Sequence, residues 1–231
     1  MASVTEADLL NLITNAVPEQ AVIDYKSKLP GNSDSDKKEF LADVSSLANA
    51  LGGHIVFGME EAQGLPTVLT GVQTADVNAE KLRFEQLISS GIAPRIHGVE
   101  IREPITLSNG RSVFIIRIAK SWMSPHMVTY QGHSKFYSRN SAGKYPLDVH
   151  QIRSAVLSSA ATSDRLRDFR AGRVSKIISG QTPAKLHAGL KIVVHLIPIN
   201  ALDTGDQFDA TTLRSIHTPG QYNQAQNHCG L

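Results

Sequence analysis

The segment that most constrains the fold is residues 47–58, which read LANALGGHIVFG. A helical apolar pattern runs into two glycines and then into an apolar strand, which predicts a tight turn from helix to strand. Gly52 would cap the helix in a left-handed conformation, and Gly53 would let another backbone come close. The amide of Asn49, one helical turn earlier, either caps the helix or faces a ligand together with the two glycines. Because these glycines follow a helix, the segment does not fit a Walker or Rossmann phosphate loop.

Helical and strand patterns alternate along the rest of the chain. Asn109-Gly110 and Gln131-Gly132 each separate two strand patterns, which predicts two β-hairpins. A capping-box pattern of Ser3 and Glu6 opens the first helix. The expected helices are 3–17, 36–51, 76–90, 147–159, 164–178 and 208–216, and the expected strands are 21–27, 54–59, 99–107, 111–119, 127–130, 135–139 and 191–197. The fold class is therefore α/β in the α+β sense, with a mixed or antiparallel sheet, two β-hairpins and helices packed on its faces.

The distribution of these patterns predicts two parts of unequal size. One domain should span residues 1–180, and a C-terminal strand-helix extension should span 181–231. The last residues are polar and aperiodic, so we expect a frayed tail.

Cysteine content and hydropathy limit the cellular compartments and the kinds of site that the sequence fits. Cys229 is the only cysteine, which excludes an intramolecular disulfide framework and a cysteine-based zinc site. The first residues lack the basic stretch and apolar core of a standard signal peptide, so we expect none, and no apolar run is long enough to cross a bilayer. We therefore expect a soluble, cytoplasmic protein with no membrane partner.

Charge is distributed unevenly along a chain whose net charge is only +2. Residues 1–110 hold 8 basic and 15 acidic side chains, a net −7, whereas residues 111–191 hold 14 and 3, a net +11. The remaining residues hold 1 and 3, a net −2. A basic segment favours a polyanionic partner, because clustered Lys and Arg release counterions from phosphate. The alternative is that the basic and acidic parts neutralise each other within the fold.

Several short motifs follow one another between residues 19 and 157. They are Glu19, Asp24-Tyr25-Lys26, Ala48-Asn49 with Gly52-Gly53, Gly58-Met59-Glu60-Glu61, Gly71-Val72 and Phe136-Tyr137 with Arg139. Their order and spacing resemble the Schlafen-type AlbA-like domain family, which is described as DNA-binding. The resemblance implies a nucleic-acid-binding module and leaves homo-oligomerisation open. The chain departs from the family pattern at two places. The family has glutamate where this chain has Asp24, and it has two aspartates where this chain has Glu60 and Glu61.

The resemblance also implies a candidate catalytic site made of carboxylates. RNA-cleaving Schlafen proteins use three of them, which fall here on Glu19, Asp24 and either Glu60 or Glu61. Clustered carboxylates can hold Mg²⁺ or Mn²⁺, which are the cofactor candidates here, although none is certain. Strand alternation requires Glu19 to lie in the turn after Pro18 if it is to reach the same metal ion as Asp24. The alternative is that Asp24 and Lys26 simply neutralise each other on one strand face.

Basic and aromatic residues alternate in the second half of this region and give a candidate nucleic-acid interface. Its members are Lys26, Lys135, Tyr137, Arg139, Lys144 and Arg153. Lys135, Tyr137 and Arg139 share a face of their expected strand, which would offer charge for phosphate and a ring for stacking. The alternative is a solvated sheet edge that lysine protects from pairing.

These observations support three hypotheses about function. The first is a module that binds DNA or RNA, the second is a metal-dependent endoribonuclease, and the third is a non-catalytic sensor or interaction domain. Salt-sensitive binding would distinguish the first from the third, and divalent-dependent RNA cleavage would distinguish the second from the first.

Overall fold

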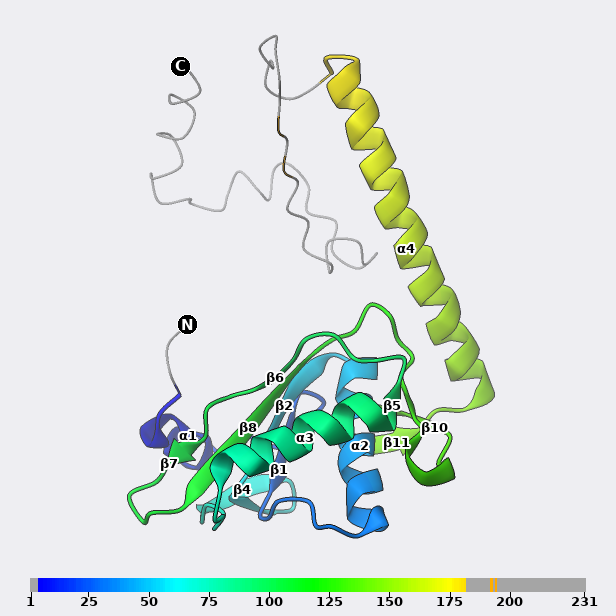
Figure 1. Ribbon diagram of the computed structural model, residues 1–231. Coiled ribbons are helices and arrows are strands. Elements are labelled where there is room, and N and C mark those ends of the chain that lie inside the picture. The colour runs from blue at the N-terminus through cyan, green and yellow to red at the C-terminus, as the bar shows by residue number, and fades with distance from the viewer. Residues whose placement is uncertain (1–3, 182–191, 193, 195–231) are drawn as a thin grey trace, which may run out of the picture. The chain divides into compact units, whose positions relative to one another are not determined.

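A five-stranded mixed sheet forms the centre of the fold, as the computed structural model shows for residues 4–181, 192 and 194 (Figure 1). The helices are α1 (Glu6–Thr14), α2 (Asp34–Asn49), α3 (Val77–Gly91), the 3₁₀ helix η1 (Tyr130–Gly132) and α4 (Val149–Ile178). The strands are β1 (Ile23–Lys26), β2 (Gly52–Phe57), β3 (Met59–Ala62), β4 (Leu65–Leu69), β5 (Ile92–Ala93), β6 (Val99–Ile101), β7 (Ile105–Thr106), β8 (Ser112–Ala119), β9 (Met127–Val128), β10 (Lys135–Asn140) and β11 (Gly143–Pro146). The expected α+β class is confirmed.

The strands form three sheets. The five-stranded sheet has the order β1-β2-β8-β6, with β7 also pairing with β8. Within it β1 and β2 are parallel and are joined through α2, while the other pairs are antiparallel. A second sheet has the order β11-β10-β9-β5, and β3 and β4 form a separate hairpin. The two predicted hairpins are both present, because β7 pairs with β8 and β9 pairs with β10.

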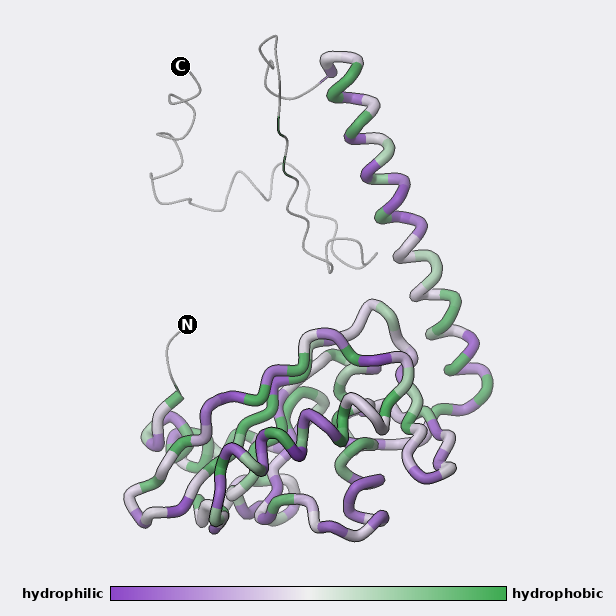
Figure 2. Tube along the Cα trace, in the orientation of Figure 1, coloured by the Kyte–Doolittle hydropathy of each residue, from purple (hydrophilic) through white to green (hydrophobic). Residues whose placement is uncertain are grey.

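The helix α2 lies against both larger sheets and contributes much of the core. Phe40, Leu41, Val44 and Leu47 are each no more than 3% exposed, and they pack with residues of β2, β8 and α3. Hydrophobic residues, green in Figure 2, run through these elements in the body of the fold. A second cluster on the other face of the central sheet joins α1 to β1 and β8. The central sheet is therefore covered by helices on both faces.

The double glycine after α2 permits the parallel contact of β1 with β2. Gly52 has a φ of +75°, and a Cβ on Gly53 would fall inside the contact distance of the Val22 carbonyl. That carbonyl accepts a hydrogen bond of 2.9 Å from the His54 backbone N–H. The close backbone approach expected for Gly53 is confirmed.

Local capping explains two differences in where the helices begin. Thr5 caps α1 and forms the capping box with Asp8, so Glu6 is the first residue of the helix and not the expected capping partner, while Ser3 lies outside the described residues. Ser33 caps α2 by accepting a hydrogen bond of 3.1 Å from the Asp36 backbone N–H, so that helix begins two residues earlier than expected.

Three further differences concern the number of elements. The expected helices 147–159 and 164–178 are one helix, α4, because no proline or glycine interrupts residues 160–163. The hairpin of β3 and β4 was missed, although Gln63-Gly64, both with positive φ, forms its two-residue turn. The short strands β5 and β11 were also missed.

The boundary between the two compact units falls after Ala161, inside α4. The predicted extension over 181–231, with its strand 191–197 and helix 208–216, lies almost entirely outside the described residues. No helix in the described part of the chain is long and apolar enough to cross a membrane.

Replacing Gly53 by Val should destabilise the protein by about 1 to 3 kcal/mol, because the side chain would overlap the Val22 carbonyl. Urea unfolding measures this change. Gly172→Ala is the control, because Gly172 lies in α4 with open space around it, and alanine there should be neutral or stabilising. An unchanged midpoint for Gly53→Val would show that the two backbones can separate without cost.

Candidate functional site

Asp24 occupies the centre of a network of charged side chains. Its side chain is 1% exposed, and it lies on β1 facing α2 and β10. Lys26 Nζ lies 2.9 Å from Asp24 Oδ2, and Arg139 Nη2 from β10 donates to Asp24 Oδ1. Arg139 is itself buried, with 4% of its side chain exposed. A carboxylate removed from water in this way requires such cations, because an unpaired buried charge is costly.

The network extends from Lys26 into α2 and on to β11. Asp43 on α2 lies 3.5 Å from Lys26 Nζ and 2.8 Å from Lys144 Nζ. Lys144 on β11 also pairs with Glu39 Oε1 at 2.6 Å. These pairs connect the central sheet to the second sheet through α2, so the network holds the two sheets together.

Glu19 lies before β1 and joins the network through Arg139. Its Oε1 is 3.5 Å from Arg139 Nη2 and accepts a hydrogen bond of 3.3 Å from the Tyr25 backbone N–H. Burial, followed by the nearby Asp24 carboxylate, raises the pKa of Glu19 to about 8. Burial alone would also raise the pKa of Asp24, but the hydrogen bond from Glu19 and the charges of Lys26 and Arg139 outweigh it, and that pKa falls to about 2. Of the two carboxyl groups, Glu19 therefore binds a proton more readily than Asp24.

The four candidate catalytic carboxylates are only partly brought together. Glu19 and Asp24 share the guanidinium of Arg139, whereas Glu60 and Glu61 are exposed on β3. Glu61 Oε2 accepts a hydrogen bond of 2.7 Å from the Gly64 backbone N–H. In residues 4–181, 192 and 194 no group of three or more His, Cys, Asp or Glu side chains is placed to hold a metal ion. The cation that Glu19 and Asp24 share in this structure is the guanidinium of Arg139, and a role of these carboxylates with Glu60 or Glu61 in holding Mg²⁺ or Mn²⁺ stays a prediction.

Asn49 joins the end of α2 to the second sheet. Its Nδ2 donates to the carbonyls of His126 and Tyr137 at 2.9 and 2.8 Å, and its Oδ1 accepts from the His126 backbone N–H at 2.7 Å. All three bonds are to backbone of the same chain. A ligand-facing role for Asn49 with Gly52 and Gly53 stays a prediction, and the structure supplies a structural role for this amide.

His126, whose backbone is hydrogen-bonded to Asn49, is completely buried. Its ring nitrogens lie 2.7 Å from the Pro94 carbonyl and 2.7 Å from the Ser121 hydroxyl. Because the carbonyl can only accept, Nδ1 carries the proton and Nε2 accepts from Ser121. Burial lowers the pKa of His126, more than the Pro94 hydrogen bond raises it.

The six residues that the sequence assigns to a nucleic-acid interface separate into three environments. Lys26, Arg139 and Lys144 belong to the internal network, with 34%, 4% and 15% of their side chains exposed. Tyr137 packs partly against the core, and only Lys135 and Arg153 are exposed. Along the strand face that Lys135, Tyr137 and Arg139 share, exposure therefore falls from the exposed Lys135 through the half-buried Tyr137 to the buried Arg139, because β10 packs against α2. Arg139 and Lys144 of the basic segment are thus neutralised by carboxylates of the acidic segment, which is the alternative that the charge distribution left open, for this part of its charge.

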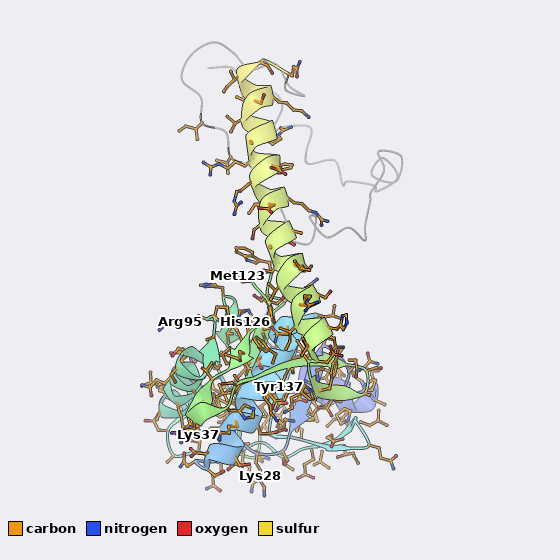
Figure 3. The ribbon with its side chains drawn as sticks, turned by 90° about the vertical axis from the view of Figure 1, so that its right-hand side faces the viewer. Lys28, Lys37, Arg95, Met123, His126 and Tyr137 are labelled. Atoms are coloured by element: carbon orange, nitrogen blue, oxygen red, sulfur yellow. The ribbon has the colours of Figure 1, made fainter. Side chains whose placement is uncertain are left out.

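A different set of basic side chains lies on the surface beside Tyr137. We call it the basic-aromatic patch, and it consists of Lys37, Lys38, Tyr130, His133, Lys135 and Tyr137. Lys37 Nζ lies 5.9 Å from the Tyr130 ring centroid. The rings of His133 and Tyr137 stack with centroids 5.9 Å apart, and His133 Nε2 is 2.8 Å from the Tyr137 hydroxyl. Figure 3 views this face and labels Lys37 and Tyr137.

The patch is positively charged at neutral pH. Burial, followed by the charges of Lys135 and Lys38, lowers the pKa of His133. Two acidic residues lie at its edge: the Asp34 Oδ1 accepts a hydrogen bond of 3.1 Å from the Tyr130 hydroxyl, and the charge of Glu39 acts on Tyr137. Four members were missed from the sequence: the pair Lys37-Lys38 lies in a segment of net negative charge, and Tyr130 and His133 flank a turn.

Comparison with known proteins adds a family match and two similar folds. The family model described as Schlafen, AlbA_2 matches residues 19–148, and no curated protein matches the chain. The DIP2311 protein from Corynebacterium diphtheriae is 18% identical, with a TM-score of 0.40, over 62% of this chain and 26% of that one. The N-terminal domain of a protein from Nitrosomonas europaea, described as related to the ATP-dependent DNA helicase RecG, is 19% identical, with a TM-score of 0.44, over 60% of this chain and 89% of that one. This chain thus spans about a quarter of the length of DIP2311.

Replacing Asp24 by Asn should cost about 3 to 5 kcal/mol of unfolding free energy, because it leaves Arg139 and Lys26 without their common partner. The control is Glu100→Gln, which removes an exposed partner of Arg117 and should cost less than about 1 kcal/mol. Denaturant unfolding of both variants makes the comparison. A similar small loss in each would mean that the Asp24 pairs contribute no more than surface pairs.

His126 should lower the stability of the protein as the pH falls below about 6.5, because its pKa is below 6.5 in the folded protein and the unfolded chain therefore binds more protons in this range. Glu19 acts in the opposite direction, because its pKa of about 8 in the folded protein lets the folded chain bind the extra proton. Urea unfolding at about pH 7.5 and about pH 5.5 should therefore show a less favourable change in stability for the parent than for His126→Gln, which cannot titrate there. Equal changes in the two proteins would exclude a contribution from His126.

Proposed function

The chain belongs to the Schlafen AlbA_2 family, whose model matches more than half of it, and from this premise we propose that it is a nucleic-acid-binding module. The observation that carries the proposal is the basic-aromatic patch, where the charges of three lysines act on three aromatic rings. The internal network is not part of the interface, because its cations already have carboxylate partners.

Phosphate groups would supply the counter-charge that the lysines of the patch lack. Lys37, Lys38 and Lys135 form no ion pair in the described part of the chain, unlike Lys26 and Lys144. Each such lysine that contacts a phosphate releases condensed counterions, which gives affinity that weakens as salt rises. DNA and RNA both present this chemistry, so the patch accounts for a polyanionic partner of either kind.

The rings add a second type of contact. His133 and Tyr137 present a stacked pair, and Tyr130 lies beside Lys37. Such rings can stack on unpaired bases, each worth about 1 to 3 kcal/mol in single-stranded complexes. We therefore expect single strands and loops to bind more tightly than a continuous duplex of the same length.

The metal-dependent endoribonuclease stays a less favoured alternative. It would use Glu19 and Asp24, which lie together, with Glu60 or Glu61, which are exposed on β3. RNA cleavage with Mn²⁺ that is lost in Glu60→Gln/Glu61→Gln would favour this alternative, and these exposed substitutions should leave the fold intact. A non-catalytic sensor or interaction domain would show neither cleavage nor salt-sensitive binding.

Replacing Lys38 and Lys135 by Gln should weaken binding of single-stranded RNA or DNA by about tenfold, because two phosphate contacts are lost. The slope of log K against log salt should also become shallower by about 0.7 to 0.9 for each contact. Fluorescence anisotropy with labelled oligonucleotides at several salt concentrations measures both quantities.

The matched control is Arg95→Gln/Arg117→Gln, which removes the same charge from exposed positions outside the patch. It should leave the salt slope unchanged. Equal weakening by the two double variants would assign binding to net charge alone. Affinity that does not depend on salt would contradict the proposal altogether.

A further inference from the structure

A polar cavity of about 960 Å³ reaches the internal network at Lys26, and none of the residues of the patch lines it. It is lined by the loop that follows β1, by the start of β3, by residues 70–73, and by side chains of α3 and the β7–β8 turn. A cavity of this size is at the upper end of the range that holds small ligands. It is therefore large enough for a mononucleotide.

The cavity lies at the carboxyl ends of the parallel strands β1 and β2. Lys26, the last residue of β1, is in register with Phe57, the last of β2, and its carbonyl accepts a hydrogen bond of 2.7 Å from the Gly58 N–H. The two strands are joined by α2, which makes a β-α-β unit (Figure 1). In folds with such units, ligands bind beyond the carboxyl ends of the parallel strands.

Close backbone packing forms one wall of the cavity. The Gly71 N–H donates to the Gly58 carbonyl at 2.9 Å, and a Cβ on Gly58 would lie 2.8 Å from the Gly71 Cα. Gly71 itself has a φ of +65°, and a Cβ there would lie 2.8 Å from the Arg111 Cβ. The absence of side chains at both glycines thus brings Arg111 close to the end of β2.

The opposite wall is held in place by α3. Arg83 Nη2 donates to the Pro30 carbonyl at 2.8 Å, and Arg83 Nε donates to Glu80 Oε2 at 2.8 Å. These bonds fix the loop of residues 27–32 before any ligand arrives. A cavity whose loop is already ordered loses less conformational entropy on binding.

The charges that remain free in the cavity define its ligand. Lys28 and Arg111 line it, and neither forms an ion pair in the described residues. Glu60 also lines it without an ion pair there, while Glu61 is bonded to the Gly64 N–H. The ligand must therefore offer an anionic group to the two cations and a hydrogen-bond donor to Glu60.

We propose that this cavity binds a nucleotide that carries a terminal phosphate. The phosphate pairs with Lys28 and Arg111, and a ribose hydroxyl donates to Glu60. Tyr25, the aromatic residue of the lining, is only 2% exposed, so the base is not stacked and is read weakly. A free mononucleotide and the phosphorylated end of a strand share this chemistry. The inference does not depend on the basic-aromatic patch.

Isothermal titration with adenosine 5′-monophosphate tests the proposal on the full chain. The parent should bind it in a saturable way and should bind uridine 5′-monophosphate with similar affinity. Adenosine and inorganic phosphate should each bind more weakly, because each lacks one half of the recognised group. In Lys28→Gln/Arg111→Gln the Kd should rise at least about tenfold, since two charged contacts are lost. Both side chains are exposed, and unchanged thermal unfolding without ligand would verify the fold.

The patch variant Lys38→Gln/Lys135→Gln separates this proposal from the proposed function. It should bind the mononucleotide as the parent does while losing affinity for long strands. Three results would overturn the assignment to the cavity: no saturable binding by the parent, an unchanged Kd in Lys28→Gln/Arg111→Gln, or an equal loss of mononucleotide binding in the patch variant. Inorganic phosphate that binds as tightly as the nucleotide would overturn the identification of the ligand.

A competition experiment distinguishes the two sources of the ligand. If a 5′-phosphorylated oligonucleotide competes better than its 5′-hydroxyl form and better than the mononucleotide, the natural ligand is a strand end. Otherwise it is the free nucleotide.

Discussion

The buried carboxylate of Asp24 is the constraint on which the arrangement of the sheets depends. An ionised side chain that is 1% exposed requires cations, and Lys26 and Arg139 supply them from β1 and β10. Asp43 and Lys144 continue the same alternation of charge through α2 to β11. Asn49 adds backbone hydrogen bonds at the other end of α2. The second sheet is therefore fixed to the first by polar contacts as well as by the apolar core.

This constraint also decides which basic residues are available to a partner. Arg139 and Lys144 account for part of the strongly basic segment, yet their charges are used inside the fold. The surface charge beside them comes from Lys37 and Lys38 on α2, a helix in the acidic part of the sequence, together with Lys135. Folding thus separates structural cations from exposed ones in a way that the linear distribution of charge does not show.

The fold was predictable where local chemistry determines it. The double glycine at 52 and 53 predicted the turn from helix to strand, and Asn109-Gly110 predicted a hairpin, because few residues adopt those backbone conformations. The site was predictable only in part. Strand alternation placed Tyr137 and Arg139 on one face, but it could not show that Arg139 would be buried at its inner end, because that depends on where α2 lies. The patch combines residues about 100 positions apart, so no local pattern could assemble it.

Lysine footprinting tests the central claim, that the chain has internal cations and separate exposed ones. Amine-specific labelling of the full chain, read by mass spectrometry with and without single-stranded RNA, reports each lysine individually. The structure predicts that Lys38 and Lys135 react readily in the free protein and become protected when RNA binds. Lys26 and Lys144 should react slowly in both states, because carboxylates already hold their ammonium groups. Ready labelling of Lys26 and Lys144 in the free protein, with protection by RNA there and not at Lys38 and Lys135, would contradict the account.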